Sequence, residues 1–254
     1  MAVLEAQGIS VRFGGKAALK DTTVVAERGR VTGLIGPNGA GKTTLFNVVC
    51  GLLAPNAGRV LLDGDDVTRK PPHRRARHGL ARTFQRLELF TSLTVRDNVR
   101  VGGDIHNSWR RGRRDSSAEA ERVLELTGLG PIASREVSEI PTGQARVVEL
   151  ARALMTQPTV LLLDEPAAGQ TEAETVAFGH LLRRLAADGI AVCLVEHDMS
   201  LVMDVCETIH VLDYGRTIAV GPPEQVRDDP AVIEAYLGTP AGLAPEGLTP
   251  EGAT

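Results

Sequence analysis

One short stretch of the sequence carries the residue types that bind phosphate groups. Its members, in chain order, are Gly36, Pro37, Asn38, Gly39, Ala40, Gly41, Lys42, Thr43 and Thr44. Glycines at this spacing let backbone N–H groups turn inward around phosphates, and a helix that follows adds partial positive charge. We expect Lys42 to bridge the terminal phosphates, the Thr43 hydroxyl to bind Mg²⁺, and Thr44 to bond the α-phosphate. The stretch therefore predicts a nucleotide site.

A second motif supplies carboxylates. An apolar run, 160–163, is followed at once by Asp164 and Glu165. Ligands of open α/β sheets bind at the carboxyl ends of strands, so Asp164 is placed to hold Mg²⁺ through its water shell. Glu165, one residue later, can point at the γ-phosphate and act as general base on the attacking water. The alternative is a buried strand that ends in a polar turn.

The elements that must position these residues alternate between strands and helices. The strands are predicted within 3–35, at 60–62, 80–84, 160–163, 190–195 and 209–212, and the helices at 43–52, 144–154 and 172–187. Capping boxes are predicted at Ser116–Glu119 and Thr171–Glu174. This alternation predicts an α/β core with a mainly parallel sheet, interrupted by a helical insertion at about 86–155.

Composition excludes several classes of protein. The 254 residues carry 28 basic and 32 acidic side chains, a net charge of −4, and only four of the basic residues are lysines. This balance disfavours a general nucleic-acid binder. No apolar run approaches the ~20 residues of a membrane span, and the first residues lack the pattern of a secretion signal. Three scattered cysteines predict neither a disulfide framework nor a metal site, and Cys50 and Cys193 are expected to be core thiols of a cytosolic protein.

Further motifs, in the same order along the chain, make the sequence resemble the ATP-binding subunit of an ABC transporter. Thr83-Phe84-Gln85 resembles the Q-loop of that family, and Val195-Glu196-His197-Asp198 resembles its switch histidine. Asp164-Glu165-Pro166 has the family's form of the second motif. The signature of the family is matched by Ile140, Pro141, Thr142, Gly143 and Gln144. The resemblance covers about residues 3–237.

The resemblance implies a fold and a set of roles. The fold is a P-loop ABC ATPase with an N-terminal antiparallel β subdomain and the helical subdomain, spanning 1–238, followed by a Pro/Gly/Ala-rich tail at 239–254 that we predict to be disordered. Phe13 would stack on adenine, or else be a core strand residue. Gln85 would reach Mg²⁺ or the attacking water, or else be a surface amide. His197 would contact the γ-phosphate and Glu165, or else be an ordinary core or surface histidine.

The signature residues have a separate implied role. They lie on the helical lobe, and in the family they close over the ATP of a second subunit from a helix N-terminus. Two ATPase subunits would then enclose two nucleotides, in a homodimer or a heterodimer. Pro141 and Thr142 replace the usual Ser and Gly, so Thr142 or the N–H groups of Gly143 and Gln144 would have to compensate. Thr171 stands where Asp or Asn is usual, which leaves open whether the two sites communicate differently or are unequal.

Four stretches make the sequence similar to the branched-chain (hydrophobic) amino acid uptake type. They are 13–15, 79–85, the Pro-Thr-Gly-Gln signature and 229–238. The similarity implies a subunit at the cytoplasmic face of the membrane, with another ATPase, two permeases and an external solute-binding protein as partners. Membrane contact would be made through the permeases, and no nucleic acid would be bound. Importers of urea or small amides, and exporters or lipid-extraction ATPases, are the alternatives.

Basic residues also gather in three clusters, at 69–70, 73–78 and 110–114. One interpretation is a solvated surface. The other is that the cluster at 110–114 lies near anionic lipid headgroups beside the permeases.

Overall fold

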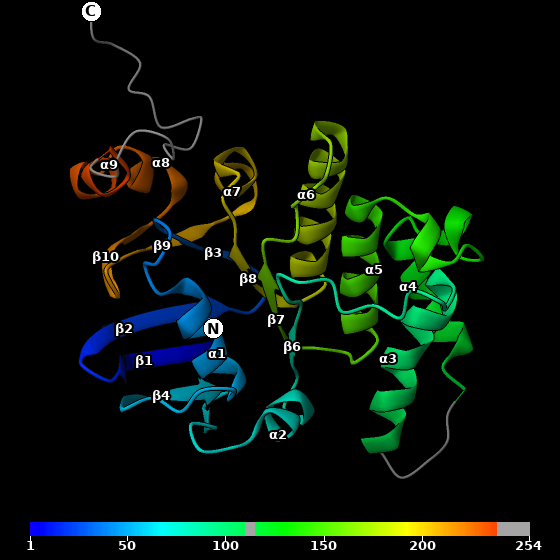
Figure 1. The fold of residues 1–254 in the computed structure, drawn as a ribbon, viewed down its shortest axis with the longest axis horizontal. Coiled ribbons are helices and arrows are strands. Elements are labelled where there is room, and N and C mark those ends of the chain that lie inside the picture. Colours follow the sequence, from blue (N-terminus) through cyan, green and yellow to red (C-terminus); the bar gives the residue numbers. More distant parts are fainter. Residues whose placement is uncertain (110–114, 238–254) are drawn as a thin grey trace, which may run out of the picture.

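The computed structural model of the protein describes residues 1–109 and 115–237. Two sheets and their covering helices form one side of the molecule in Figure 1, and a group of helices forms the other. That second group contains α3 (Val95–Trp109), α4 (Ser117–Leu126) and α5 (Thr142–Leu154). These three helices lie in the segment between strands β6 (Leu80–Arg82) and β7 (Val160–Asp164), which pair side by side. The sequence predicts helices in this segment. The basic cluster at 110–114 and the tail at 239–254 lie outside the described residues.

The first sheet is antiparallel and has the strand order β2-β1-β4-β5. Its strands are β1 (Ala2–Phe13), β2 (Lys16–Glu27), β4 (Ala57–Leu62) and β5 (Asp65–Asp66). Gly14, with φ of 57°, takes part in the tight turn between β1 and β2. The expected N-terminal antiparallel sheet is confirmed.

The second sheet has the order β10-β9-β3-β8-β7-β6, and all of its neighbours are parallel except β9 and β10. Its strands are β3 (Val31–Ile35), β6 (Leu80–Arg82), β7 (Val160–Asp164), β8 (Ala191–Val195), β9 (Thr208–Asp213) and β10 (Arg216–Gly221). Every residue of β3, β7 and β8 is buried, as expected for parallel strands covered on both faces. The predicted mainly parallel core is confirmed.

Strand β7 shows why its sequence is apolar throughout. Val160 and Leu162 belong to the core between the two sheets, which also takes in α1 (Lys42–Cys50). Leu161 and Leu163 belong to the core on the opposite face of the sheet. Successive strand residues point to opposite faces, so both faces require apolar side chains.

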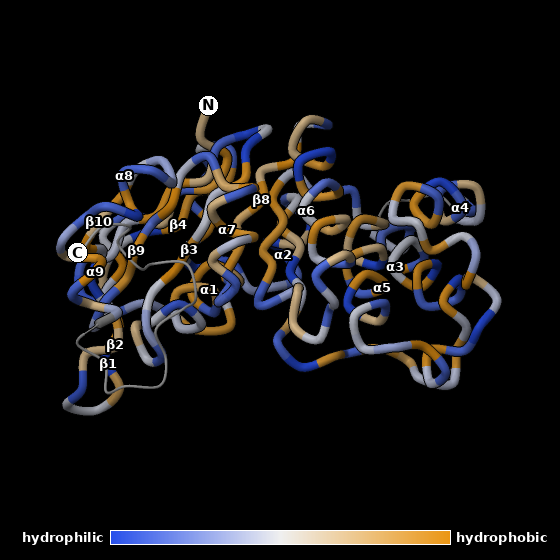
Figure 2. The backbone as a smooth tube through the Cα atoms, turned by 90° about the horizontal axis from the view of Figure 1, so that it is seen from above, coloured by the Kyte–Doolittle hydropathy of each residue, from blue (hydrophilic) through white to orange (hydrophobic). Residues whose placement is uncertain are grey.

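Several helices cover the faces of this sheet, and the last of them form the C-terminal end of the described chain. They are α6 (Glu172–Ala187), α7 (Met199–Val205), α8 (Pro223–Arg227) and α9 (Pro230–Leu237), while α2 (Pro72–Arg77) precedes β6. The tube in Figure 2 shows hydrophobic segments along the strands, and hydrophobic turns that alternate with hydrophilic turns along the helices. Among the described residues, no helix combines the length and the apolar character needed to cross a bilayer.

The two predicted capping boxes have different outcomes. At the start of α6, Thr171 Oγ1 accepts from the Glu174 N–H at 3.3 Å, and the Glu174 carboxylate accepts from the Thr171 N–H at 2.8 Å, which confirms the prediction. At the start of α4 the prediction is wrong, because the Ser116 hydroxyl donates instead to Asp104 Oδ1 of α3 at 2.8 Å. The Asp115 carboxylate accepts a hydrogen bond from the Ser117 N–H at 2.9 Å.

Arg75 in α2 departs from the interpretation of its cluster as a solvated surface. Its side chain is buried, and its donors reach the carbonyl oxygens of Val48 and Val49, at 2.7 and 2.6 Å. Other donors of the same guanidinium bind the carbonyls of Lys70 and Thr68. Burial lowers the pKa of Arg75 from its usual value. Arg75 therefore binds two carbonyls in the last turn of α1, and the Val48 carbonyl also accepts from the Gly51 N–H.

Candidate functional site

The glycine-rich loop connects β3 directly to α1, and its shape depends on its glycines. Gly36, Gly39 and Gly41 have φ of 146°, 80° and 113°, values that favour glycine. A Cβ on Gly36 would lie 2.0 Å from the Leu212 carbonyl oxygen, and a Cβ on Gly41 would lie 2.8 Å from Leu19 Cδ2. No other residue fits at these two points, so the loop can turn tightly ahead of the helix N-terminus.

Lys42 is the first residue of α1, and its side chain folds back over the loop. Its Nζ donates to the carbonyls of Gly36 and Pro37, at 2.5 and 3.1 Å. Burial lowers the pKa of Lys42, while the charges of Glu165 and Asp164 act in the opposite direction. The ammonium group therefore lies at the mouth of the loop, with carbonyl partners that phosphate oxygens could replace.

A cavity of about 680 Å³ gathers most of the predicted site residues. Its lining includes the loop residues 38–44 together with Phe13, Gln85, Glu165 and His197. This volume is in the range of sites for small molecules and cofactors. Phe13 is 56% exposed, so the alternative that it is a core strand residue is wrong.

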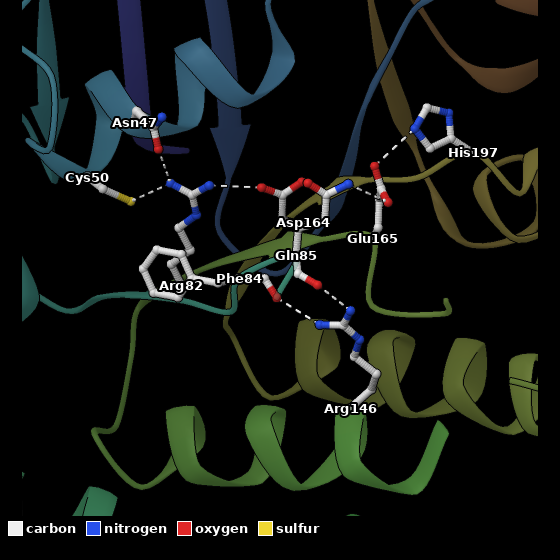
Figure 3. Close-up of polar contacts among 9 residues, drawn as sticks. All are labelled: Asn47, Cys50, Arg82, Phe84, Gln85, Arg146, Asp164, Glu165 and His197. Carbon is white, nitrogen blue, oxygen red and sulfur yellow. Dashed lines mark hydrogen bonds and ion pairs between the residues drawn. The ribbon is translucent and has the colours of Figure 1, made fainter. Parts of the chain in front are cut away.

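Two of these side chains meet at the carboxylate of a third, as Figure 3 shows. Gln85 Nε2 donates to Glu165 Oε2 at 3.0 Å, and His197 Nε2 lies in hydrogen-bond contact with Glu165 Oε1, also at 3.0 Å. Glu165 follows β7 with φ of 51°, and its N–H donates to the Val195 carbonyl of the neighbouring strand β8. Strands β7 and β8 end in register, Asp164 beside Val195, which brings the residues that follow them together. The carboxylate is thus held at both oxygens.

The structure adds a residue that the sequence interpretation had left without a role. Arg82, the last residue of β6, donates from Nη2 to Asp164 Oδ2 at 2.8 Å, and from Nη1 to Asn47 Oδ1 of α1 at 2.7 Å. Its guanidinium carbon also lies 5.4 Å from the centre of the Phe46 ring and 4.8 Å from that of Phe84. The side chains of Arg82 and Asp164 are 6% and 2% exposed, which makes this a buried ion pair. An arginine next to the predicted Q-loop was the available signal, but the sequence does not show its partner.

The residues predicted to bind Mg²⁺ offer ligands of the right kind. Thr43 and Gln85 line the cavity, and they provide a hydroxyl and an amide oxygen. Arg82 binds Oδ2 of Asp164, and Oδ1 is the other oxygen of the same carboxylate. Mg²⁺ prefers such oxygen ligands together with water and substrate phosphates. Within residues 1–109 and 115–237, no group of three or more His, Cys, Asp or Glu side chains is arranged to hold a metal ion.

The signature residues lie apart from this cavity. Pro141 precedes α5 with φ of −60° and ψ of 154°, and Thr142 begins the helix. A Cβ on Gly169 would lie 3.3 Å from Thr142 Cγ2, and a Cβ on Gly143 would lie 3.1 Å from Gln170 Cγ. Thr142 and Gly143 therefore sit against the loop that follows Glu165. The described lining of the cavity contains none of Ile140, Pro141, Thr142, Gly143 and Gln144.

Two further residues shape the loops around the site. Thr171 caps α6, so it performs the N-cap task for which Asp and Asn are also suited. Glu196, which the sequence interpretation left without a role, accepts from the N–H of Ala167 at 2.7 Å and of His197 at 3.0 Å. Burial raises the pKa of Glu196 in spite of these donors. Its carboxylate joins the loop after Glu165 to the loop that carries His197, and its position just after a buried strand was the available signal.

Residues 19–168 match the family described as ABC transporter. Residues 216–242 match a second family description, branched-chain amino acid ATP-binding cassette transporter.

Several curated proteins are similar over nearly the whole chain. The high-affinity branched-chain amino acid transport ATP-binding protein BraF of Pseudomonas aeruginosa is 40% identical over 249 residues, 93% of this chain and 98% of BraF. LivG of Escherichia coli, whose name describes the same role, is 38% identical with the same coverage. The lipopolysaccharide export system ATP-binding protein LptB of Haemophilus influenzae is 32% identical over 94% of this chain and 98% of its own.

A solved structure is similar in three dimensions. The ADP conformation of MJ1267, an ATP-binding cassette of an ABC transporter, has a TM-score of 0.85 and 32% sequence identity. The match covers 94% of this chain and 99% of that one.

Proposed function

The chain belongs to the ABC transporter family, and from this premise we propose that it is the ATP-binding and ATP-hydrolysing subunit of an importer for branched-chain or other hydrophobic amino acids. The convergence of Gln85 and His197 on Glu165, beside the phosphate-binding loop, carries the hydrolytic part of this proposal. The match of 216–242 to the branched-chain family description supports the solute class. The names of BraF and LivG support the same class.

ATP would bind in the 680 Å³ cavity with its adenine ring on the exposed face of Phe13. Its phosphates would accept from backbone N–H groups of residues 38–43, and the Lys42 ammonium would exchange its loop carbonyls for the terminal phosphates. Thr43, Gln85 and Asp164 would hold Mg²⁺, which supplies positive charge against the phosphate oxygens when it is bound. The Thr44 hydroxyl would bond the α-phosphate.

Hydrolysis would depend on the Glu165 carboxylate as general base. It would accept a proton from water while the water oxygen bonds to the γ-phosphorus and the bond to the ADP oxygen breaks. Gln85 and His197 would fix the orientation of the Glu165 carboxylate, because each contacts one of its oxygens at 3.0 Å. Such fixed orientation is a large part of catalysis in phosphoryl transfer.

The proposed assembly contains more than this chain. Because Ile140–Gln144 lie outside the cavity of their own chain, we propose that they close over the nucleotide of a second ATPase subunit, identical or different. Two permeases and an external solute-binding protein would complete the importer. The chain would then sit at the cytoplasmic face of the membrane and contact it through the permeases.

Replacement of Thr142 with alanine tests the proposed role of the signature hydroxyl. A hydrogen bond to a charged group contributes about 1.5–3 kcal/mol, so ATPase activity of the assembled transporter should fall roughly tenfold or more. Thr156→Ala is the matched control, because the Thr156 hydroxyl bonds the Ala153 carbonyl at the other end of α5. If Thr142→Ala hydrolyses ATP like the control, the N–H groups of Gly143 and Gln144 carry the contact instead.

Reconstitution with the permeases and binding protein tests the solute. We expect leucine, isoleucine or valine with the binding protein to stimulate ATP hydrolysis severalfold over the same complex without solute. Stimulation by urea or acetamide alone would move the assignment to an importer of small amides. Stimulation by lipid, with no response to any amino acid, would contradict import and favour a system like that of LptB.

A further inference from the structure

The segment that carries Gln85, residues 84–90, lies outside the helices and strands of the structure. Arg146 of α5 holds its beginning: Nη1 donates to the Phe84 carbonyl at 2.8 Å, and Nη2 donates to the Gln85 carbonyl. Both contacts are visible in Figure 3. One planar guanidinium that binds two successive carbonyls fixes the orientation of the backbone as well as its distance.

Two more side chains of α5 hold the middle of the same segment. Glu149 Oε1 accepts from the Glu88 N–H at 2.7 Å, and Arg152 donates to the Glu88 carbonyl. Glu149 Oε2 also lies 3.3 Å from Arg146 Nη1, and the side chains of this pair are 10% (Arg146) and 3% (Glu149) exposed. Positions 146, 149 and 152 share one face of the helix because they are three residues apart. This face supplies the polar partners that an exposed loop backbone otherwise takes from water.

The same helix begins with the signature. Arg146 lies four positions after Thr142 in continuous α-helix, about 6 Å along its axis. On the far side of the segment, the Gln85 amide reaches Glu165. An unbroken series of contacts therefore runs from the N-terminus of α5, through Arg146 and the backbone of Gln85, to the hydrolytic carboxylate.

We propose that Arg146 is a positioning residue that makes the Gln85–Glu165 contact depend on the position of α5. Engagement of the signature end of α5 by a partner subunit's nucleotide is thereby transmitted to the general base of this chain's own site. The inference rests on the proposed ATPase function. Packing alone would not require a fork that binds two adjacent carbonyls of the loop.

Two substitutions of Arg146 separate this role from simple support of the fold. Arg146→Met removes the fork, and Arg146→Lys keeps the charge beside Glu149 but cannot bind both carbonyls in the same way. The matched control is Arg122→Met, because Arg122 pairs with Glu119 at the same i,i+3 spacing on α4, away from residues 84–90.

Both Arg146 variants should lower kcat of the assembled transporter roughly tenfold, since small displacements of catalytic groups are costly. The KM for ATP should stay within about twofold, because the phosphate loop is untouched. Amide hydrogen exchange at 85–88, measured on the full chain alone, should accelerate in both variants and be unchanged in Arg122→Met. Loss of stability without this local acceleration, or kcat equal to that of the control, would overturn the inference. Absence of ATP hydrolysis by the wild-type transporter would refute the proposed function itself.

Discussion

Glu165→Gln should lower kcat for ATP hydrolysis by about 10²–10⁴-fold, the usual contribution of a general base, while ATP still binds. Glutamine has nearly the same shape but cannot accept the proton of the attacking water. The new amide has one oxygen, which can accept from Gln85 Nε2, and an NH2 group that would face His197 Nε2. The variant should therefore keep ATP bound and accumulate the closed pair of ATPase subunits.

The measurement is steady-state hydrolysis together with gel filtration in the presence of Mg-ATP. Glu224→Gln serves as the control, since Glu224 is exposed on α8, and it should hydrolyse ATP like the wild type and show no trapped dimer. Rapid turnover by Glu165→Gln would exclude Glu165 as the base.

Arg82→Leu should lower the free energy of unfolding by about 3–5 kcal/mol, because it leaves the buried Asp164 carboxylate without its partner. The chain offers a matched comparison in Arg28→Leu. Arg28 and Asp63 are separated by the same 2.8 Å, but their side chains are 46% and 48% exposed. A pair of that kind contributes about 0–1 kcal/mol, so the two variants should differ widely in urea unfolding.

A second variant guards against a simple packing defect at position 82. Asp164→Asn added to Arg82→Leu removes the unpaired charge, so it should recover part of the lost stability. Equal destabilisation by Arg82→Leu and Arg28→Leu would show that burial does not decide the strength of this pair. No recovery in the double variant would assign the loss to the contacts of Arg82 with Phe46, Phe84 and Asn47 instead.

The predictable parts of the fold and site were those encoded over short distances. Strand β7 is apolar at every position before Asp164, and such a run indicates a strand buried on both faces. The glycines of the phosphate loop have positive φ angles, and their spacing beside Lys42 and Thr43 is visible in the sequence itself. Parallel pairing of β7 with β8 then brings Glu165 and His197 together without any further information.

The parts that escaped prediction depend on partners far away in the sequence. Arg82 finds Asp164 and Arg146 finds Gln85 across separations of 82 and 61 residues, which no local pattern reveals. The capping boxes show the same limit on a smaller scale. The Thr171 hydroxyl accepts from Glu174 of its own helix, whereas the Ser116 hydroxyl donates to Asp104 of another helix.

Arg75 anchors the C-terminal end of α1, the helix that follows the phosphate loop. The nine residues of α1 span about 13 Å, and Arg75 grips their C-terminal end while the loop occupies the other. A tilt of only about 4° around that grip moves the phosphate end by about 1 Å, a displacement large enough to matter for catalysis. The Arg75 contacts therefore tie the position of the phosphate loop to that of the short helix α2 at the opposite end of α1.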